Sequence, residues 1–277
     1  MGDWLDRLRV SYHYLRTVRR PLNLGQPRAF TEKVQLAKLT WRSPRMVALA
    51  DKVKSKKVVA ALLGPEWVTP TIFAGAALPP RSDRNWPVPY VIKCNHRSGG
   101  NHFVLSADPD WAGIERSVAR QLSRRYGRRL AEWVYTQIPP QVLVEPYLGN
   151  PGVPPDYKLH LFGGKFGFTL VNWDRFSVGG MQRATFDRAW KRLPFSISSD
   201  GDYQGDDLPR RPASYEEMIA GAETLVQGFP FARVDLYEIG GRPRFGEVTF
   251  YPQSGYLRMP RRHDLEIGAM WPAGVPT

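Results

Sequence analysis

The sequence predicts an α+β fold of two lobes, and three features of the 277-residue chain support this. Helical periodicity dominates up to about residue 63, where Gly64-Pro65 ends the helical pattern. Short apolar segments bounded by turn residues follow, as expected of antiparallel strands. The sequence lacks the regular strand–helix alternation of a doubly wound parallel sheet, so helices and sheets are expected to segregate.

The first half of the chain is expected to hold a helical segment followed by a small sheet. Apolar side chains recur at helical spacing between Val47 and Leu62. One long helix is predicted from Trp111 to Tyr135. The predicted strands cover residues 71–73, 90–93, 103–105 and 142–145.

The second half is expected to consist of hairpins joined by a loop and a helix. Two hairpins are predicted, over residues 156–174, with Gly163-Gly164 at the turn, and over residues 232–250. Residues 177–212 are rich in Gly, Pro, Ser and Asp, which predicts a long functional loop. Ser214 is expected to cap a helix that runs to Gln227, with Glu217 completing a capping box. A proline-rich tail is expected after the second hairpin.

The net charge of +13 is concentrated at the N-terminal end of the chain. Residues 1–60 contain 14 Lys and Arg against 4 Asp and Glu, whereas the remainder is nearly balanced. Such a segment favours an anionic partner, so residues 1–60 are the predicted contact with a polyanionic glycan or an anionic membrane. Nucleic acid is not expected, because the sequence has no zinc-finger spacing, aromatic RNA-binding signature or heptad-linked basic region.

Apolar and basic residues near the N-terminus recur at a spacing that predicts an amphipathic helix. The apolar residues are Trp4, Leu8, Tyr12, Leu15 and Val18. Docking of this stripe on the body of the protein, with the arginines in water, is the more common arrangement. The alternative is a helix that lies on an anionic membrane surface. No run approaches the ~20 apolar residues that a membrane-spanning helix needs, and the single cysteine, Cys94, excludes a disulfide scaffold.

Two carboxylates on the last predicted hairpin form a candidate metal site. Asp235 lies directly opposite Glu247 if the turn consists of the three residues 240–242. Carboxylates this close repel each other unless a cation lies between them, and Mg²⁺ prefers oxygen ligands. Arg233, on the same face, would then meet a transferred phosphoryl group. The alternative is an Asp–Arg–Glu ion-pair cluster on a solvated face of the sheet.

Two further segments carry candidate binding groups. An apolar strand delivers Lys93 directly before a glycine-containing loop, where a lysine and backbone N–H groups can surround phosphate oxygens. A strand that ends at Glu145-Pro146 exposes backbone groups that can pair with the edge of an adenine. Each segment, taken alone, is equally consistent with a structural turn or strand end.

Taken in order, these segments resemble the ATP-grasp superfamily, and more specifically its TupA-like branch, which is associated with teichuronopeptide biosynthesis. The resemblance covers residues 28–268. It rests on a series of short motifs, which are Phe30-Thr31-Glu32-Lys33, Asp51-Lys52, VIKCNHRSGGN, VLVEPYL, DYKLHLFGGK, Asp174-Arg175, ARVDLYEIGGRPRFGEVTFYPQSG and Asp264.

The resemblance implies that two antiparallel sheets sandwich ATP together with Mg²⁺. For the phosphates of ATP it implies contacts from Lys158 and from Lys93, which would reach the α and β phosphates with Lys54 or Lys56 as helper. A loop of Ser98, Gly99, Gly100 and Asn101 would close over the phosphates. Glu145 and Tyr147 would flank the adenine, and Asp156 would hold the ribose. For Mg²⁺ it implies Asp235 and Glu247, with Thr249 where the superfamily often has Asn, which leaves the third ligand open. For catalysis it implies Lys93 and Arg233, and on the acceptor side Arg175, Ser254 and Gly255.

The activity that this resemblance implies is an ATP-dependent carboxylate–amine ligase that forms an amide through an acyl phosphate. The TupA-like branch points to a surface polysaccharide or uronic-acid conjugate as acceptor and an amino acid as amine. The first alternative is a kinase that phosphorylates a sugar hydroxyl, and the more distant one is a non-enzymatic basic module that binds nucleic acid or membrane.

The expected organisation is a basic helical segment over residues 1–63, a small nucleotide-binding lobe over 64–148, and a large lobe with the metal and acceptor sites over 149–277. The expected location is the cytoplasm, with peripheral contact at the inner membrane face.

Overall fold

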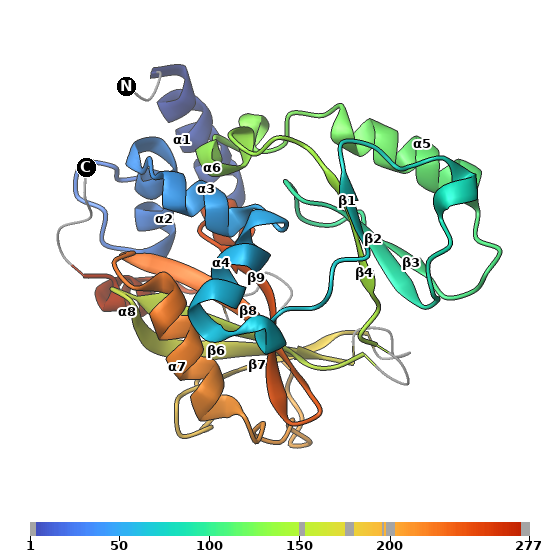
Figure 1. Cartoon of the computed structure of the whole chain (residues 1–277). Helices are drawn as coiled ribbons and strands as arrows, with labels where there is room; N and C mark the ends of the chain where they lie inside the picture. Colours follow the sequence, from blue (N-terminus) through green and yellow to red (C-terminus); the bar gives the residue numbers. More distant parts are fainter. Residues whose placement is uncertain (1–3, 150–152, 175–179, 196, 198–202, 273–277) are drawn as a thin grey trace.

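The computed structural model describes residues 4–149, 153–174, 180–195, 197 and 203–272. Two antiparallel sheets are preceded by a group of helices (Figure 1). These helices are α1 (Trp4–Val18), α2 (Phe30–Thr40), α3 (Pro44–Ala50) and α4 (Lys54–Leu63). As predicted, α4 ends at Gly64, whose φ of 108° favours glycine.

The small sheet contains four strands in the order β1-β4-β2-β3. Its strands are β1 (Phe73–Gly75), β2 (Tyr90–Cys94), β3 (His102–Val104) and β4 (Val142–Pro146). All pairs are antiparallel, and helix α5 (Trp111–Leu122) covers one face. Ile114 and Val118 of α5 pack on the apolar side chains of β2 and β4, so the opposite face remains for ligands.

The single long helix predicted between Trp111 and Tyr135 is wrong. The chain leaves α5 after Leu122, and the short helix α6 begins only at Trp133 (Trp133–Thr136). Between these two helices, Gly127 and Ala131 adopt left-handed φ values of 84° and 56°, and they flank the 3₁₀ turn η3 (Arg128–Leu130). The helical periodicity did not reveal this turn, although the glycine that begins it is visible in the sequence.

The large sheet contains five strands in the order β7-β6-β5-β8-β9. Its strands are β5 (Asp156–Phe162), β6 (Lys165–Trp173), β7 (Gln182–Phe186), β8 (Phe231–Ile239) and β9 (Arg242–Thr249). Helix α7 (Tyr215–Val226) packs against the apolar side chains of β5 and β8. Strand alternation therefore turns Asp156, Lys158, Arg233 and Asp235 toward the other face.

Both predicted hairpins are confirmed, but three details of the second half differ from expectation. Part of the predicted loop over 177–212 forms the edge strand β7, and the proline-rich tail contains helix α8 (Arg261–Met270). Ser214 precedes α7 as predicted, but the capping box is wrong. The Ser214 backbone N–H and hydroxyl both donate to Glu238 of β8, at 2.8 and 2.6 Å, so the cap contacts the sheet.

Helix α1 packs on the body of the protein with a different face from the one that the sequence predicts. Val10, Tyr14 and Val18 are buried, and the Tyr14 hydroxyl lies 2.7 Å from the Thr31 hydroxyl on α2. The exposed face carries five large apolar side chains, called here the α1 stripe: Trp4, Leu5, Leu8, Tyr12 and Leu15. Of the predicted stripe only Val18 is buried, so docking of that stripe on the protein is wrong, and an i, i+4 series of Val10, Tyr14 and Val18 occupies the interface instead.

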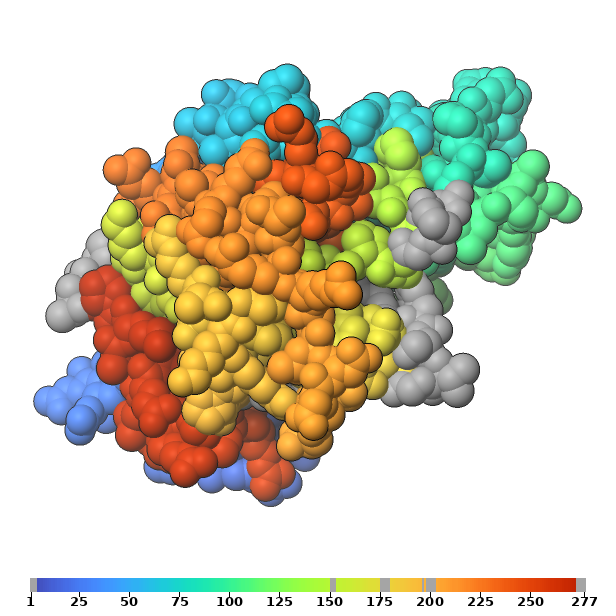
Figure 2. Space-filling model, turned by 90° about the horizontal axis from the view of Figure 1, so that it is seen from below, coloured from blue at the N-terminus to red at the C-terminus, as the bar shows by residue number. Residues whose placement is uncertain are grey.

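The N-terminal helices are held against the C-terminal helix. The backbone N–H and hydroxyl of Thr31 both donate to the Asp264 carboxylate of α8, at 2.9 and 2.8 Å. Lys33 donates to the carbonyls of Gly268 and Trp271. Figure 2 shows the red C-terminal region lying beside the blue N-terminal helices. Among the described helices, none is long and apolar enough to cross a membrane.

Candidate active site

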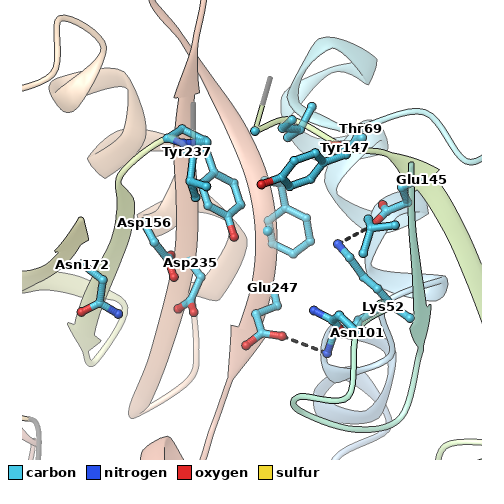
Figure 3. A pocket seen from close by; sticks show the side chains of 18 of the residues that line it. Lys52, Thr69, Asn101, Glu145, Tyr147, Asp156, Asn172, Asp235, Tyr237 and Glu247 are labelled. Carbon is cyan, nitrogen blue, oxygen red and sulfur yellow. Dashed lines mark hydrogen bonds and ion pairs between the residues drawn. The ribbon is translucent and has the colours of Figure 1, made fainter. Parts of the chain in front are cut away.

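A cavity of about 440 Å³ lies between the two sheets, where residues far apart in the sequence meet. Figure 3 shows Asp156, Asp235 and Glu247 along the large sheet, with Glu145 and Lys52 on the opposite side. The cavity lining includes these predicted site residues: Lys93, Ser98, Gly99, Asn101, Glu145, Tyr147, Asp156, Lys158, Arg233, Asp235 and Glu247.

The hairpin β8–β9 pairs Asp235 directly with Glu247, but through a turn other than the expected one. The turn contains two residues, Gly240 and Gly241, with left-handed φ values of 59° and 74°. The extra residue is taken up by a β-bulge at Gly246. A Cβ at Gly246 would lie 2.9 Å from the Asp235 carbonyl oxygen, so this close approach requires glycine.

Two cations hold the Asp235 carboxylate from opposite sides. Arg233 donates to both carboxylate oxygens, at 2.6 and 2.7 Å, and Lys158 donates to one of them at 2.5 Å. Lys158 also contacts Asp156 at 2.6 Å. Burial alone would lower the pKa of Lys158, but the charges of Asp156 and Asp235 outweigh it and raise the pKa above its ordinary value.

Lys52 connects the N-terminal helical segment to the large sheet. Its ammonium lies 2.8 Å from a Glu247 oxygen and donates to the Arg97 carbonyl at 3.0 Å. Burial would raise the pKa of Glu247, but Lys52, followed by Arg233 and Lys158, lowers it to about 2. The cavity floor is therefore charge-balanced, with three carboxylates (Asp156, Asp235, Glu247) facing three cations (Lys52, Lys158, Arg233).

The paired carboxylates have the chemistry of a Mg²⁺ site that is completed by a ligand. Asp235 and Glu247 supply hard oxygen donors from adjacent strands, and Mg²⁺ is typically bound by one or two carboxylates together with phosphate oxygens. Thr249 does not line the cavity, and its hydroxyl accepts from Arg233 at 3.2 Å. Within the described ranges no cluster of three His, Cys, Asp or Glu could hold a metal ion.

On the opposite wall, Lys93 is oriented by a buried carboxylate. Lys93 contacts one oxygen of Glu145 at 2.7 Å, and Lys56 of α4 contacts the other. Burial would raise the pKa of Glu145, but these two lysines hold it below its ordinary value. Of the two expected helper lysines, Lys56 contacts Glu145 whereas Lys54 is exposed, and neither lines the cavity. The Glu145 side chain therefore holds both Lys93 and Lys56 in place.

The glycine loop after β2 is anchored at its start. The Asn95 amide donates to the Asp51 carboxylate at 3.0 Å and accepts from the Gln141 backbone at 2.7 Å. Ser98, Gly99 and Asn101 then reach the cavity. Gly100 does not, because it lies against Gln121 of α5, whose amide donates to the Gly100 carbonyl.

An apolar slot adjoins these polar groups. Tyr147 and Phe103 meet edge to face with ring centroids 5.2 Å apart, and Val91 and Phe245 line the slot from the two sheets. A flat aromatic base fits such a slot, and the charged groups of the cavity floor line the same cavity. This division of polar and apolar lining suits a nucleotide.

Sequence reasoning gave no role to some cavity residues, among them Lys52 and Asn172, and it placed Ser254 and Gly255, like Gly100 and Thr249, in a site that they do not line. Lys52 had no assigned role, and Asn172 carries a buried side-chain oxygen that has no partner among the described residues. Ser254 lies away from the cavity, where Lys38 holds both its carbonyl and its hydroxyl. The neighbouring Gly255 is also outside the lining. Arg175 lies outside the described residues.

Comparison with known proteins shows the family to which the chain belongs. The profile of the family described as TupA-like ATPgrasp matches residues 32–271. The chain therefore belongs to the TupA-like ATP-grasp family, and the predicted ATP-grasp fold is confirmed. Among curated proteins, none matches the chain.

Several solved structures have a similar fold. They include the D-alanine–D-alanine ligase of Bacillus anthracis, with 19% identity over 73% of this chain and 56% of that one and a TM-score of 0.40. The Helicobacter pylori D-alanine–D-alanine ligase has 14% identity over 88% and 69%, with a TM-score of 0.42. The ATP-grasp ligase PsnB, in complex with a phosphomimetic variant of its minimal precursor, Mg and ADP, has 13% identity over 84% and 62%, with a TM-score of 0.45. The chain thus spans little more than half of the first of these ligases.

Proposed function

We propose that the protein is an ATP-dependent carboxylate–amine ligase that activates its acceptor as an acyl phosphate. The observation that carries this proposal is the cavity floor, where three carboxylates and three cations balance each other between the sheets. Such a floor can bind a magnesium nucleotide if its ion pairs separate. The three cations would then contact phosphate oxygens, and Asp235 and Glu247 would contact Mg²⁺. Membership of the ATP-grasp family supports the same assignment.

The reaction transfers one phosphoryl group and then forms one amide bond. An acceptor carboxylate oxygen attacks the γ-phosphorus of ATP, and ADP leaves. The amine then attacks the acyl carbon, inorganic phosphate leaves with that oxygen, and the amine loses one proton. Bound Mg²⁺ supplies a counter-charge to the phosphates. Lys93 and Lys158 hold phosphate oxygens, and Arg233 stabilises the negative charge on the transferred group.

The proposed acceptor is a surface polysaccharide or uronic-acid conjugate, and the proposed amine is an amino acid. The TupA-like family assignment supports this substrate class, and so does the excess of 14 basic over 4 acidic residues in the first 60. A cationic surface concentrates an anionic acceptor near the cavity. The proposed location is the cytoplasm, where ATP is available.

Trapping the activated carboxylate with hydroxylamine tests the proposal. Uronic acids incubated with enzyme, ATP, Mg²⁺ and hydroxylamine should yield a hydroxamate together with ADP and phosphate. Arg233→Met should lower the rate by about 100-fold, whereas Arg242→Met, an exposed control on β9, should not. A stable phosphorylated sugar without any need for an amine would identify a kinase instead. Phosphate release without hydroxamate or amide would refute the ligase.

A second proposal is that α1 holds the enzyme on an anionic membrane. The five side chains of the α1 stripe are between 47% and 65% exposed. Trp4, Leu8, Tyr12 and Leu15 recur at helical spacing along one face, and exposed Arg7 and Arg16 flank them. Aromatic and leucine side chains beside arginines are typical of helices that lie in the membrane interface.

Vesicle co-sedimentation tests this contact. Trp4→Ala combined with Leu8→Ala should weaken binding to phosphatidylglycerol vesicles by about tenfold. The matched control, Leu62→Ala with Leu105→Ala, removes two equally exposed side chains elsewhere and should bind normally. Equal binding by both variants would refute the proposal, as would equal binding of wild type to neutral vesicles.

A further inference from the structure

A second cavity, called here the basic cleft, has a volume of about 920 Å³ and shares no lining residue with the nucleotide cavity. It lies where α1 approaches α6 and the segment between α5 and α6 (Figure 1). The two cavities meet at the loop after β2, since His96 lines the basic cleft and Ser98 lines the nucleotide cavity.

Three arginines give the basic cleft its free positive charge. Arg124, Arg125 and Arg128 line it, are exposed, and form no ion pair with any part of the chain that the structure describes. The other cations of the cleft already have partners. Arg9 contacts Asp6 at 2.5 Å, and Arg42 donates to three carbonyls at the end of α2.

These arginines belong to the turn that interrupts the predicted helix, with the sequence Arg124-Arg125-Tyr126-Gly127-Arg128-Arg129. The Gly127 carbonyl accepts from the Leu130 and Glu132 backbones at 3.2 and 2.9 Å. A Cβ at Gly127 would lie 2.7 Å from the Glu132 carbonyl oxygen. The turn is therefore tightly constrained, and it presents its arginines from a fixed backbone.

We propose that the basic cleft binds a segment of an acidic polysaccharide. Guanidinium groups pair well with carboxylates and phosphates, so a row of three suits a chain that carries one anion on successive sugars. The cleft is concave, which does not suit a flat membrane surface. The polysaccharide as occupant rests on the proposed function, whereas the anionic character of the ligand rests on the cleft alone.

The aromatic residues of the cleft argue against nucleic acid. Binding of single strands relies on open aromatic faces on which bases stack. Here the Arg42 guanidinium lies 4.9 Å above the Trp133 ring, and Arg97 lies 5.6 Å from the Tyr126 ring. Tyr135 packs edge to face against Tyr126. These rings are already engaged by protein groups, which leaves the arginines as the recognition elements.

The position of the cleft suits an acceptor that must reach the nucleotide. His96 and Arg97, at the start of the glycine loop, lie against Tyr126, with ring centroids 6.5 Å apart for His96 and the Arg97 guanidinium 5.6 Å from the ring, so the arginine turn and the glycine loop are in contact. The same loop lines both cavities, with His96 on the side of the cleft and Ser98 on the side of the nucleotide cavity. The cleft would thus hold the body of a polymer while its end reacts.

A charge-matched pair of variants tests the proposal with polygalacturonate as probe. The triple variant Arg124→Gln, Arg125→Gln and Arg128→Gln should weaken polymer binding by about tenfold. The control Arg116→Gln, Arg120→Gln and Lys191→Gln removes the same charge from exposed sites outside the cleft and should bind normally. Thermal unfolding establishes that both variants are folded.

The activity readout separates this proposal from the proposed function. The cleft variant should keep its rate with monomeric uronic acid and show a raised KM only for the polymer. Equal weakening in both variants would overturn the site, and so would wild-type binding to single-stranded DNA or anionic vesicles but not to polygalacturonate. Polymer binding that depends on the turn in a protein without ligase activity would support the cleft and refute the proposed function.

Discussion

The ion pair between Lys52 and Glu247 should contribute measurably to folding stability. The pKa of Glu247 is lowered from 4.5 to about 2, and each pKa unit corresponds to ~1.36 kcal/mol, so ionised Glu247 contributes about 3 kcal/mol. Lys52 is the largest charge acting on it. A double-mutant cycle with Lys52→Met and Glu247→Gln should therefore give a coupling energy of about 2 kcal/mol at neutral pH.

The pH dependence of this coupling has a definite sign. The pKa of Glu247 is lower in the folded state, so its contribution is complete above about pH 4.5 and is lost as the pH falls toward 2. Urea unfolding at about pH 7 and about pH 3 should show the coupling fall by roughly half. The same cycle with exposed Lys54→Met should give no coupling. A Lys52–Glu247 coupling below about 0.5 kcal/mol at pH 7 would refute the reasoning.

Three further substitutions test other parts of the site. Asp235→Asn should reduce the Mg²⁺-dependent gain in ADP affinity by about tenfold in calorimetric titration, and an unchanged gain would exclude Asp235 as a ligand. Gly246→Ala places a Cβ 2.9 Å from the Asp235 carbonyl oxygen. It should cost about 2 kcal/mol of unfolding free energy, and wild-type stability would contradict the bulge. Burial lowers the pKa of Lys38 and raises that of its neighbour Glu132, each to about 7. Lys38→Met removes the cation that faces Glu132, so the loss should be largest near pH 7, at ~3 kcal/mol, and smaller both at about pH 5, where Glu132 is protonated, and at about pH 9, where Lys38 is neutral; a pH-independent loss would contradict the pairing.

Local patterns were sufficient to predict most of the elements that carry the site. The strand before Lys93 and the hairpin that pairs Asp235 with Glu247 follow from alternation and turn residues close in the sequence. The exact turn did not follow, because a two-residue turn with a bulge and a three-residue turn give the same pairing. Only the closeness of Gly246 to the opposite strand distinguishes them.

Features that depend on distant contacts were not predictable from the sequence. Lys52 is a site residue only because the N-terminal segment docks beside β9, far away along the chain. The face that α1 buries depends on α2, since Val10, Tyr14 and Val18 have the same spacing as the exposed stripe. The turn at Gly127 is stabilised by hydrogen bonds from the Leu130 and Glu132 backbones to the Gly127 carbonyl. Helical periodicity does not reveal these bonds, so it predicts one continuous helix through the same residues.

The central claim is tested most directly by a crystal structure with Mg²⁺ and a non-hydrolysable ATP analogue. The account predicts the base beside Tyr147, the phosphates among Lys93, Lys158 and Arg233, and Asp235 and Glu247 released from those cations to hold Mg²⁺. A nucleotide bound outside this cavity, or a filled cavity in which the ion pairs of Asp235 and Glu247 remain unchanged, would contradict it.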